Sequence, residues 1–140
     1  MRGGIERMTS NNNQIVLTTG FECNNDCVMC SVGSKLNNKN NSTTEEIFKI
    51  LSEGRKNNSL SVDFTGGEPT VRKDLPRLIL FAKMMGYKTI GISTNGMLLS
   101  DNSYCEKLVK AGLNSIIFEM GSLIVELGAA VEKAWMAWIR

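Results

Sequence analysis

The chain has 140 residues, which is enough for one modest domain that buries about two-thirds of the surface of its unfolded form. Its 16 basic and 14 acidic residues give a net charge of +2, a balance that does not favour nucleic acid or an anionic membrane as a partner. No apolar run approaches the roughly 20 residues of a transmembrane helix and no secretory signal precedes the first predicted strand, so we expect a cytoplasmic protein.

The first predicted strand covers residues 14–20 and follows a polar N-terminal tail over residues 1–13. Ile15, Val16 and Leu17 form a continuous apolar run at its start. Such a run is typical of a strand that is covered on both faces, as in a parallel sheet. We therefore expect a parallel sheet.

Three cysteines follow this strand in the segment F-E-C-N-N-D-C-V-M-C, the cysteine segment, which covers residues 21–30. Cys23, Cys27 and Cys30 are separated by three and then two residues. Thiolates this close together can converge on one soft metal centre, above all an iron–sulfur cluster or zinc, and the pattern does not resemble a secreted disulfide framework. In a cubane [4Fe–4S] cluster three thiolates hold three irons, which leaves the fourth iron open to another ligand.

The fourth cysteine, Cys105, lies far from the other three. It falls on an apolar stripe with Tyr104, Leu108 and Val109 at helical spacing. We expect a buried core thiol at this position rather than a metal ligand.

The next predicted element is a helix that begins at Ser42 or Thr43. Glu45 or Glu46 lies three residues further on and completes a capping box with one of these hydroxyl residues. The polar run at residues 55–59 ends this helix.

Two further helices are marked by their ends. Asp74 is the expected N-cap of the second helix, and Gly86 is its expected stop. Ser100 or Asp101 is the expected cap of the third helix, which runs to Gly112.

The stretches between these helices have the character of strands. In the first of them, the apolar residues Val62 and Phe64 alternate against Asp63. Strand–helix units of about 26 residues join parallel strands by right-handed crossovers, so the sequence predicts an α/β fold with four parallel strands in sequence order. After the strand at residues 14–20, the others are expected at residues 60–65, 88–93 and 114–118.

Two glycine-containing motifs lie where predicted strands end. The motif G-G-E-P covers residues 66–69, and the motif S-T-N-G covers residues 93–96. Both dipeptides G-G and N-G also occur in ordinary turns. However, the carboxyl ends of parallel strands share one edge of the sheet, so both motifs and the cysteine segment should converge where α/β sheets bind ligands.

These three motifs, in this order over roughly residues 14–119, resemble those of the radical S-adenosylmethionine (radical SAM) superfamily. The resemblance implies a parallel-sheet partial (β/α) barrel of the radical SAM type, with about four of about six expected βα units present. It also implies that Cys23, Cys27 and Cys30 bind a [4Fe–4S] cluster whose open iron chelates S-adenosylmethionine. Met29 departs from the family, which usually has an aromatic residue before the third cysteine.

By the same resemblance, two loops hold the S-adenosylmethionine. Backbone groups of the G-G-E-P motif would hydrogen-bond the methionyl ammonium, with Glu68 supporting the loop, and the S-T-N-G motif would contact the ribose or the carboxylate. The implied cofactor-binding residues are Gly66, Gly67, Glu68, Pro69, Ser93 and Asn95.

The implied activity is that of an oxidoreductase-like radical enzyme. One electron enters the sulfonium, the S–C5′ bond breaks, and the resulting 5′-deoxyadenosyl radical abstracts hydrogen from a substrate that the resemblance leaves open. A flavodoxin or ferredoxin would supply the electron. The chain contains no histidine, and no residue is assigned to acid–base catalysis.

Residues 121–140 are predicted to form a C-terminal helix of unclear role, after an incomplete core over residues 14–120. Because only four strands are counted, we expect a C-terminally truncated member of the family, a fragment, or one half of an assembly. Two alternatives stay open: a structural zinc- or cluster-binding module without S-adenosylmethionine, and an inactive remnant. Zinc normally takes a fourth protein ligand, and none lies near the three cysteines in the sequence.

Overall fold

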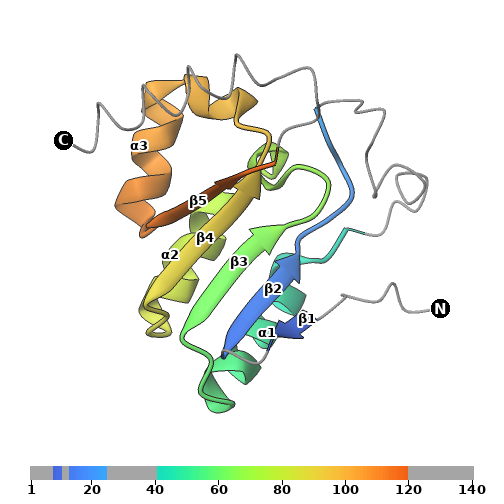
Figure 1. Cartoon of the computed structure of the whole chain (residues 1–140), viewed down its shortest axis with the longest axis vertical. Coiled ribbons are helices and arrows are strands. Elements are labelled where there is room, and N and C mark those ends of the chain that lie inside the picture. Colours follow the sequence, from blue (N-terminus) through green and yellow to red (C-terminus); the bar gives the residue numbers. More distant parts are fainter. Residues whose placement is uncertain (1–7, 11–12, 25–40, 120–140) are drawn as a thin grey trace.

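The computed structural model describes residues 8–10, 13–24 and 41–119. Within these ranges the chain forms one sheet with the strand order β1-β2-β3-β4-β5 (Figure 1). The strands β2 to β5 run parallel, as the sequence predicts, and β1 lies antiparallel beside β2. The strands are β1 (Met8–Ser10), β2 (Gln14–Thr18), β3 (Ser61–Thr65), β4 (Thr89–Thr94) and β5 (Ser115–Phe118).

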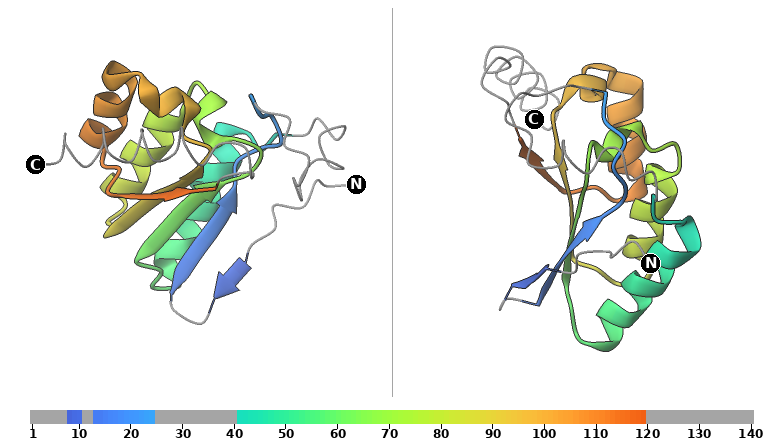
Figure 2. Two further views of the ribbon diagram at one scale, coloured as in Figure 1. Left: turned by 45° about the horizontal axis from the view of Figure 1, so that its top comes forward. Right: turned by 90° about the vertical axis from the view of Figure 1, so that its right-hand side faces the viewer.

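The α-helices of the described residues cover one face of the sheet, as the edge-on view in Figure 2 shows. Each helix connects two neighbouring parallel strands. Helices on one side only are the arrangement of a (β/α) barrel, whereas a doubly wound sheet has helices on both faces. The predicted α/β fold of the partial-barrel type is thus confirmed. The helices are α1 (Thr44–Lys56), α2 (Leu75–Met84) and α3 (Asn102–Ala111), with short 3₁₀ helices η2 (Pro69–Val71) and η3 (Met97–Ser100).

Helix α1 begins with the predicted capping box. The hydroxyl of Thr43 accepts a hydrogen bond of 3.2 Å from the Glu46 N–H, and the Glu46 carboxylate accepts one of 2.8 Å from the Thr43 N–H. This reciprocal pair satisfies two backbone donors that have no partner inside a helix. The face that packs on the sheet contains Ile47, Leu51 and Gly54, all buried.

The capping prediction is wrong in one respect at helix α2. Asp74 occupies the N-cap position, but its side chain makes no capping hydrogen bond. Its carboxylate binds Arg72 and Thr44 instead, because both donors approach it from outside the helix. At helix α3 the predicted cap is confirmed, since Asp101 accepts a hydrogen bond of 2.9 Å from the Ser103 N–H.

The hydrophobic core lies between the sheet and the three helices. Alternate residues of the strands point into it, and Leu17, Phe64 and Ile92 are completely buried there. Each large apolar side chain that is fully buried contributes about 1.5–3 kcal/mol relative to exposure. This layer therefore holds the carboxyl ends of β2, β3 and β4 in fixed positions.

Cys105 belongs to this core, with 8% of its surface exposed, so the prediction of a buried core thiol is confirmed. Burial raises the pKa of this thiol, and the charge of Glu106 adds to the effect. A thiol that stays protonated is a poor metal ligand.

The other face of the sheet contains a buried carboxylate. Val62 and Phe64 face the helices, as the alternation in β3 predicts, but Asp63 on the opposite face is only 6% exposed. It accepts a hydrogen bond of 2.6 Å from the Ser93 hydroxyl. Burial raises the pKa of Asp63, and the bond from Ser93 lowers it in part. Gly91 makes room for this side chain, since a Cβ there would lie 2.8 Å from the Asp63 Oδ1 atom.

Strand β1 is an element that the sequence pattern did not predict. It lies within residues 1–13, which were expected to form a polar tail, and it pairs with β2 through Met8 opposite Val16. Pairing at a sheet edge uses backbone groups and therefore leaves no apolar signature in the sequence. The predicted helix over residues 121–140 lies outside the described residues. None of the helices in the described ranges is long and apolar enough to cross a membrane.

Candidate functional site

Three segments meet at the carboxyl edge of the parallel sheet, where Figure 1 shows the ends of β2, β3 and β4 side by side. They are residues 19–24 after β2, residues 66–70 after β3, and residues 94–97 at the end of β4. The predicted convergence of the three motifs is therefore present in the part of the chain that the structure describes. It follows from the parallel strand order, since each strand ends at the same edge.

The turn after β3 is bonded directly to the start of the cysteine segment. The N–H of Gly67 donates a hydrogen bond of 2.9 Å to the carbonyl of Gly20, and the N–H of Glu68 donates one of 2.8 Å to the carbonyl of Glu22. Gly66 has a φ of 141°, which favours glycine, and a Cβ on it would meet the Gly20 carbonyl oxygen. A Cβ on Gly67 would lie 2.7 Å from the carbonyl oxygen of Phe21. Both glycines are thus required by the close approach of two backbone segments.

This bonding pattern determines what the turn can offer to a ligand. The N–H groups of Gly67 and Glu68 are already used, and among the described residues no N–H donates to the carbonyls of Gly66 or Gly67. The carbonyls of Gly66 and Gly67 are therefore candidate acceptors for a ligand at this edge. Carbonyl oxygens suit a ligand with a positively charged donor, such as a primary ammonium group.

Glu68 joins the second motif to the third. Its side chain is 3% exposed and accepts hydrogen bonds from the hydroxyls of Thr70 and Thr94, both at 2.5 Å. It also accepts from the backbone N–H of Thr70 at 3.2 Å and from that of Asn95 at 2.7 Å. These four donors replace the hydrogen bonds to water that the Glu68 carboxylate loses on burial. Its arrangement agrees with a supporting role for the loop.

Tyr104 closes the far side of this network. Its hydroxyl donates a hydrogen bond of 3.0 Å to the carbonyl of Thr70. Burial raises the pKa of Tyr104 to about 12, and the negative charge of Glu68 contributes to that shift. The phenol therefore remains a hydrogen-bond donor at neutral pH.

Asn95 links the third motif to the cysteine segment. Its side-chain nitrogen donates a hydrogen bond of 2.8 Å to the Oδ1 atom of Asn24, and its own Oδ1 accepts one of 3.0 Å from the Met97 N–H. Asn24 directly follows Cys23, which is half-buried. The structure thus brings Asn95 to the residue that follows the first cysteine, while Cys27 and Cys30 lie outside the described residues.

The Ser93 side chain bonds to a residue of the neighbouring strand, whereas those of Glu68 and Asn95 bond across the segments that meet at this edge. Its hydroxyl binds Asp63 on the helix-free face and is 7% exposed. Strand β4 continues to Thr94, and because side chains alternate along a strand, Thr94 rather than Ser93 reaches Glu68. A direct cofactor contact by Ser93 stays a prediction.

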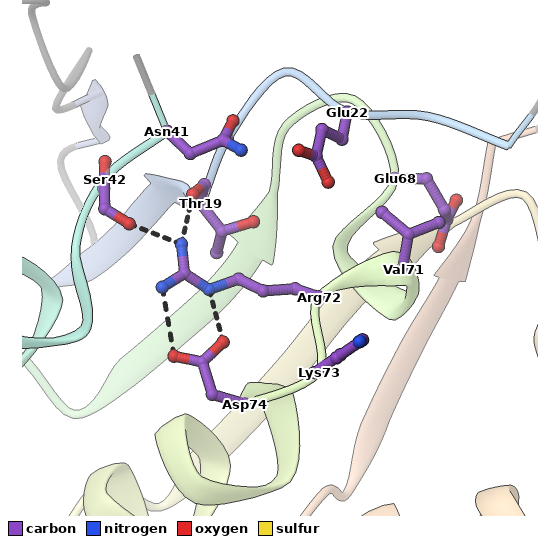
Figure 3. A pocket seen from close by; sticks show the side chains of 10 residues that line it. Thr19, Glu22, Asn41, Ser42, Glu68, Val71, Arg72, Lys73 and Asp74 are labelled. Carbon is purple, nitrogen blue, oxygen red and sulfur yellow. Dashed lines mark hydrogen bonds and ion pairs between the residues drawn. The ribbon is translucent and has the colours of Figure 1, made fainter. Parts of the chain in front are cut away.

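A cavity of about 290 Å³ lies beside this edge, between the end of β2 and the start of α2 (Figure 3). The Arg72 guanidinium stands in its wall and donates hydrogen bonds to the carbonyls of Thr19 and Ser42, both at 2.6 Å. Arg72, Thr70 and Thr94 were not among the site residues predicted from the sequence. No sequence motif marks the arginine or Thr70. The alternation of side chains along β4 would have indicated Thr94, because it points to the opposite face from Ser93.

Comparisons with known proteins agree with the motifs. A sequence model of the family described as the Radical SAM superfamily matches residues 17–120. The chain is 34% identical over 104 residues to the 7,8-dihydro-6-hydroxymethylpterin dimethyltransferase of Methanocaldococcus jannaschii, a match that covers 72% of this chain and 21% of that protein.

Two probable GTP 3′,8-cyclases are similar to a comparable degree. The enzyme of Saccharolobus solfataricus is 35% identical over 100 residues, which cover 71% of this chain and 32% of the relative. The enzyme of Sulfurisphaera tokodaii is 32% identical over 123 residues, which cover 88% of this chain and 39% of the relative. The chain thus spans between 21% and 39% of the length of these curated relatives.

A solved structure shares the fold. The crystal structure of BtrN in an open conformation superposes with a TM-score of 0.62 at 19% sequence identity, over 79% of this chain and 51% of that one. At this identity the likeness concerns the fold alone. It agrees with a sheet whose parallel strands follow sequence order and whose helices cover one face.

Proposed function

Because the chain belongs to the radical SAM superfamily, we propose that it binds a [4Fe–4S] cluster through Cys23, Cys27 and Cys30. S-adenosylmethionine binds beside the cluster, at the carboxyl edge of the parallel sheet. The protein then belongs among the enzymes of this superfamily, and its substrate contains a C–H bond that loses hydrogen.

One observation carries this proposal: the turn after β3 is bonded to the start of the cysteine segment, and no N–H of the described residues donates to its Gly66 and Gly67 carbonyls. The bonds from Gly67 to Gly20 and from Glu68 to Glu22 place these acceptors within the same small region as Cys23. A ligand on the open iron of a cluster that Cys23 helps to hold would lie beside them. The acceptors match the ammonium of a methionyl group, so the residues present fit the proposed cofactor.

When bound, the cluster and S-adenosylmethionine supply a one-electron reductive cleavage that releases methionine and a 5′-deoxyadenosyl radical. The protein positions the S-adenosylmethionine. The carbonyls of Gly66 and Gly67 would receive its ammonium group, and Glu68 holds their turn against β4 through Thr94 and Asn95. Placement matters because a displacement of about 1 Å can slow an enzymatic step roughly a hundredfold.

The bond between Asn95 and Asn24 gives the cysteine segment a second support. It ties the residue after Cys23 to the end of β4, independently of the turn after β3. We propose that Asn95 acts by this route, and that a flavodoxin or ferredoxin supplies the electron. Two of the similar enzymes are named for reactions on GTP and on a pterin, so we propose a nucleotide or a pterin as the substrate class.

Anaerobic reconstitution of the full chain tests the proposal. We expect about four irons and four sulfides per chain, and a change in the electron paramagnetic resonance (EPR) spectrum of the reduced cluster when S-adenosylmethionine is added. Chromatography of the products should then reveal 5′-deoxyadenosine. Tight zinc binding without iron uptake would support a structural module instead, and a cluster without any spectral response to S-adenosylmethionine would contradict the cofactor site.

A further inference from the structure

Arg72 lies where the two ends of the cysteine-containing part of the chain come together. Its Nη1 atom donates hydrogen bonds of 2.6 Å to the carbonyls of Thr19 and Ser42 (Figure 3). Thr19 precedes the three cysteines in the sequence, and Ser42 follows them. We call residues 19–22 and 41–43 the two stems, since they precede and follow the part of the chain that contains Cys27 and Cys30. One guanidinium group bridges the two stems.

The other side of the guanidinium is held rigidly. Nε and Nη2 of Arg72 bind the two carboxylate oxygens of Asp74 at 2.7 and 3.0 Å, which is a bidentate pair. Asp74 also accepts a hydrogen bond of 2.6 Å from the hydroxyl of Thr44. The arginine is thus fixed to the start of α2, and through Thr44 to the start of α1.

The protonation state of Asp74 favours this arrangement. Burial alone would raise its pKa, but the hydrogen bonds from Arg72 and Thr44 and the positive charge of Arg72 lower it overall. The carboxylate stays ionised at neutral pH, and the side chains of Arg72 and Asp74 are only 16% and 27% exposed. Partly buried bidentate pairs of this kind are stronger than ion pairs in solvent.

These contacts leave Arg72 little capacity for a ligand. A guanidinium has five N–H donors, and four hydrogen bonds to Asp74, Thr19 and Ser42 use most of them. A binding arginine would keep its donors directed into the cavity. The geometry therefore favours a role in holding the chain rather than in binding a small anion.

We infer that Arg72 is a positioning residue for the proposed cluster: it clamps the two stems of the cysteine-containing segment onto the starts of α1 and α2. The inference rests on the proposed function for its purpose, although the clamp itself is visible in the structure. Asn41 assists it, because its side chain accepts a hydrogen bond of 2.9 Å from the Phe21 N–H across the same two stems. Lysine cannot replace Arg72, because an ammonium group lacks the planar fork that meets a carboxylate and two carbonyls at once.

Two variants of the full chain test the clamp, Arg72→Lys and Arg72→Gln. Arg77→Lys is the matched control, since Arg77 is an exposed arginine of helix α2 and lies over the Phe48 ring at 5.4 Å. The first measurement is amide hydrogen exchange in the metal-free chain. We expect exchange at Phe21 and Gly67 to accelerate about tenfold or more in both Arg72 variants, while the core amides of β3 and β4 stay protected.

The second measurement is iron bound per chain after reconstitution, together with the EPR spectrum of the reduced cluster. We expect the Arg72 variants to retain less than about half of the iron and to give a broadened spectrum, because the thiolate ligands are less well positioned. Arg77→Lys should match the parent chain in both measurements.

The outcomes separate this inference from the proposed function. If the parent chain takes up no cluster, the proposed function fails. Amide hydrogen exchange at Phe21 and Gly67 in the metal-free chain then still tests whether Arg72 holds the two stems. Parent-like exchange and iron content in Arg72→Lys would overturn the inference. Loss of core protection in Arg72→Lys would also overturn it, since Arg72 would then serve the stability of the whole fold rather than the two stems.

Discussion

The hydroxyl of Thr94 donates a hydrogen bond of 2.5 Å to the carboxylate of Glu68, and this contact joins the end of β4 to the turn after β3. This turn also holds the start of the cysteine segment through two backbone hydrogen bonds. Motifs that are far apart in the sequence are therefore connected through a single buried carboxylate.

Replacing Glu68 with Gln should destabilise the protein. The carboxylate accepts four hydrogen bonds, and an amide would direct its NH₂ group at donors that need an acceptor. We expect the free energy of unfolding to fall by about 2–3 kcal/mol, since hydrogen bonds to charged groups are among the strong ones. Urea unfolding followed by circular dichroism measures this change.

The control for this variant is Glu45→Gln in the first turn of α1. Glu45 is exposed, and its favourable interaction with the helix dipole is worth less than about 1 kcal/mol. Equal losses of stability in the two variants would show that the buried network around Glu68 has no special strength.

Replacing Gly67 with Ala should disturb the proposed cofactor site. An added Cβ would lie 2.7 Å from the Phe21 carbonyl oxygen, so either the turn or the cysteine segment must move. We expect a loss of about 1–3 kcal/mol in stability, typical of overpacking. The EPR response of the reduced cluster to S-adenosylmethionine should also be lost.

Gly86→Ala is the control, because it adds backbone strain away from the proposed cofactor site. Gly86 has a φ of 90°, and its nearest neighbour is an Arg55 side-chain atom 3.8 Å from an added Cβ. The left-handed backbone alone should reduce stability by about 1–2 kcal/mol. A normal response to S-adenosylmethionine is expected here, and a normal response in Gly67→Ala as well would argue against the site.

The cysteines should differ in their effect on iron binding. Cys23→Ala is expected to abolish the cluster, because it removes one of three thiolate ligands. Cys105→Ala should leave the iron content unchanged and reduce stability by about 1 kcal/mol, since Cys105 is an 8% exposed core residue. Iron analysis after anaerobic reconstitution checks both, and loss of iron in Cys105→Ala would require a different ligand set.

Asp63 should make stability depend on pH. Burial raises its folded pKa above the ordinary value of 3.8, although the bond from Ser93 opposes this. Above that value the unfolded chain has released the proton that the folded chain still binds, so this group lowers stability as the pH rises through its folded pKa. Asp63→Asn should therefore increase stability at pH 7 relative to the parent chain.

The same gain should disappear near pH 3.8 and below, where Asp63 is protonated in both states. Ser93→Ala should instead reduce stability at pH 7, because it removes the donor that favours the charged form of Asp63. Urea midpoints measured across this pH range test the sign. A gain in Asp63→Asn that is independent of pH would mean that packing rather than charge is responsible.

The periodic and local features of the fold were accessible from the sequence. The order of the four parallel strands and the three α-helices follows from apolar runs and their spacing, whereas β1 left no such signal. The capping box of Thr43 and Glu46 depends on residues three positions apart. The convergence of the motifs also follows, because parallel strands end at one edge whatever their side chains are. Cys105 was placed in the core by its helical stripe alone.

The tertiary structure alone decided which side chains meet. Asp74 binds Arg72 and Thr44 instead of capping α2, because donors from another segment compete for its carboxylate and have no trace in the local pattern. Asp63 is buried because Gly91 on the neighbouring strand leaves space for it, and such cross-strand fit depends on register. The sequence thus determined the elements and the edge where they converge, while long-range packing determined the bonds of Glu68 and Arg72, because the partners of both lie on segments that only folding brings together.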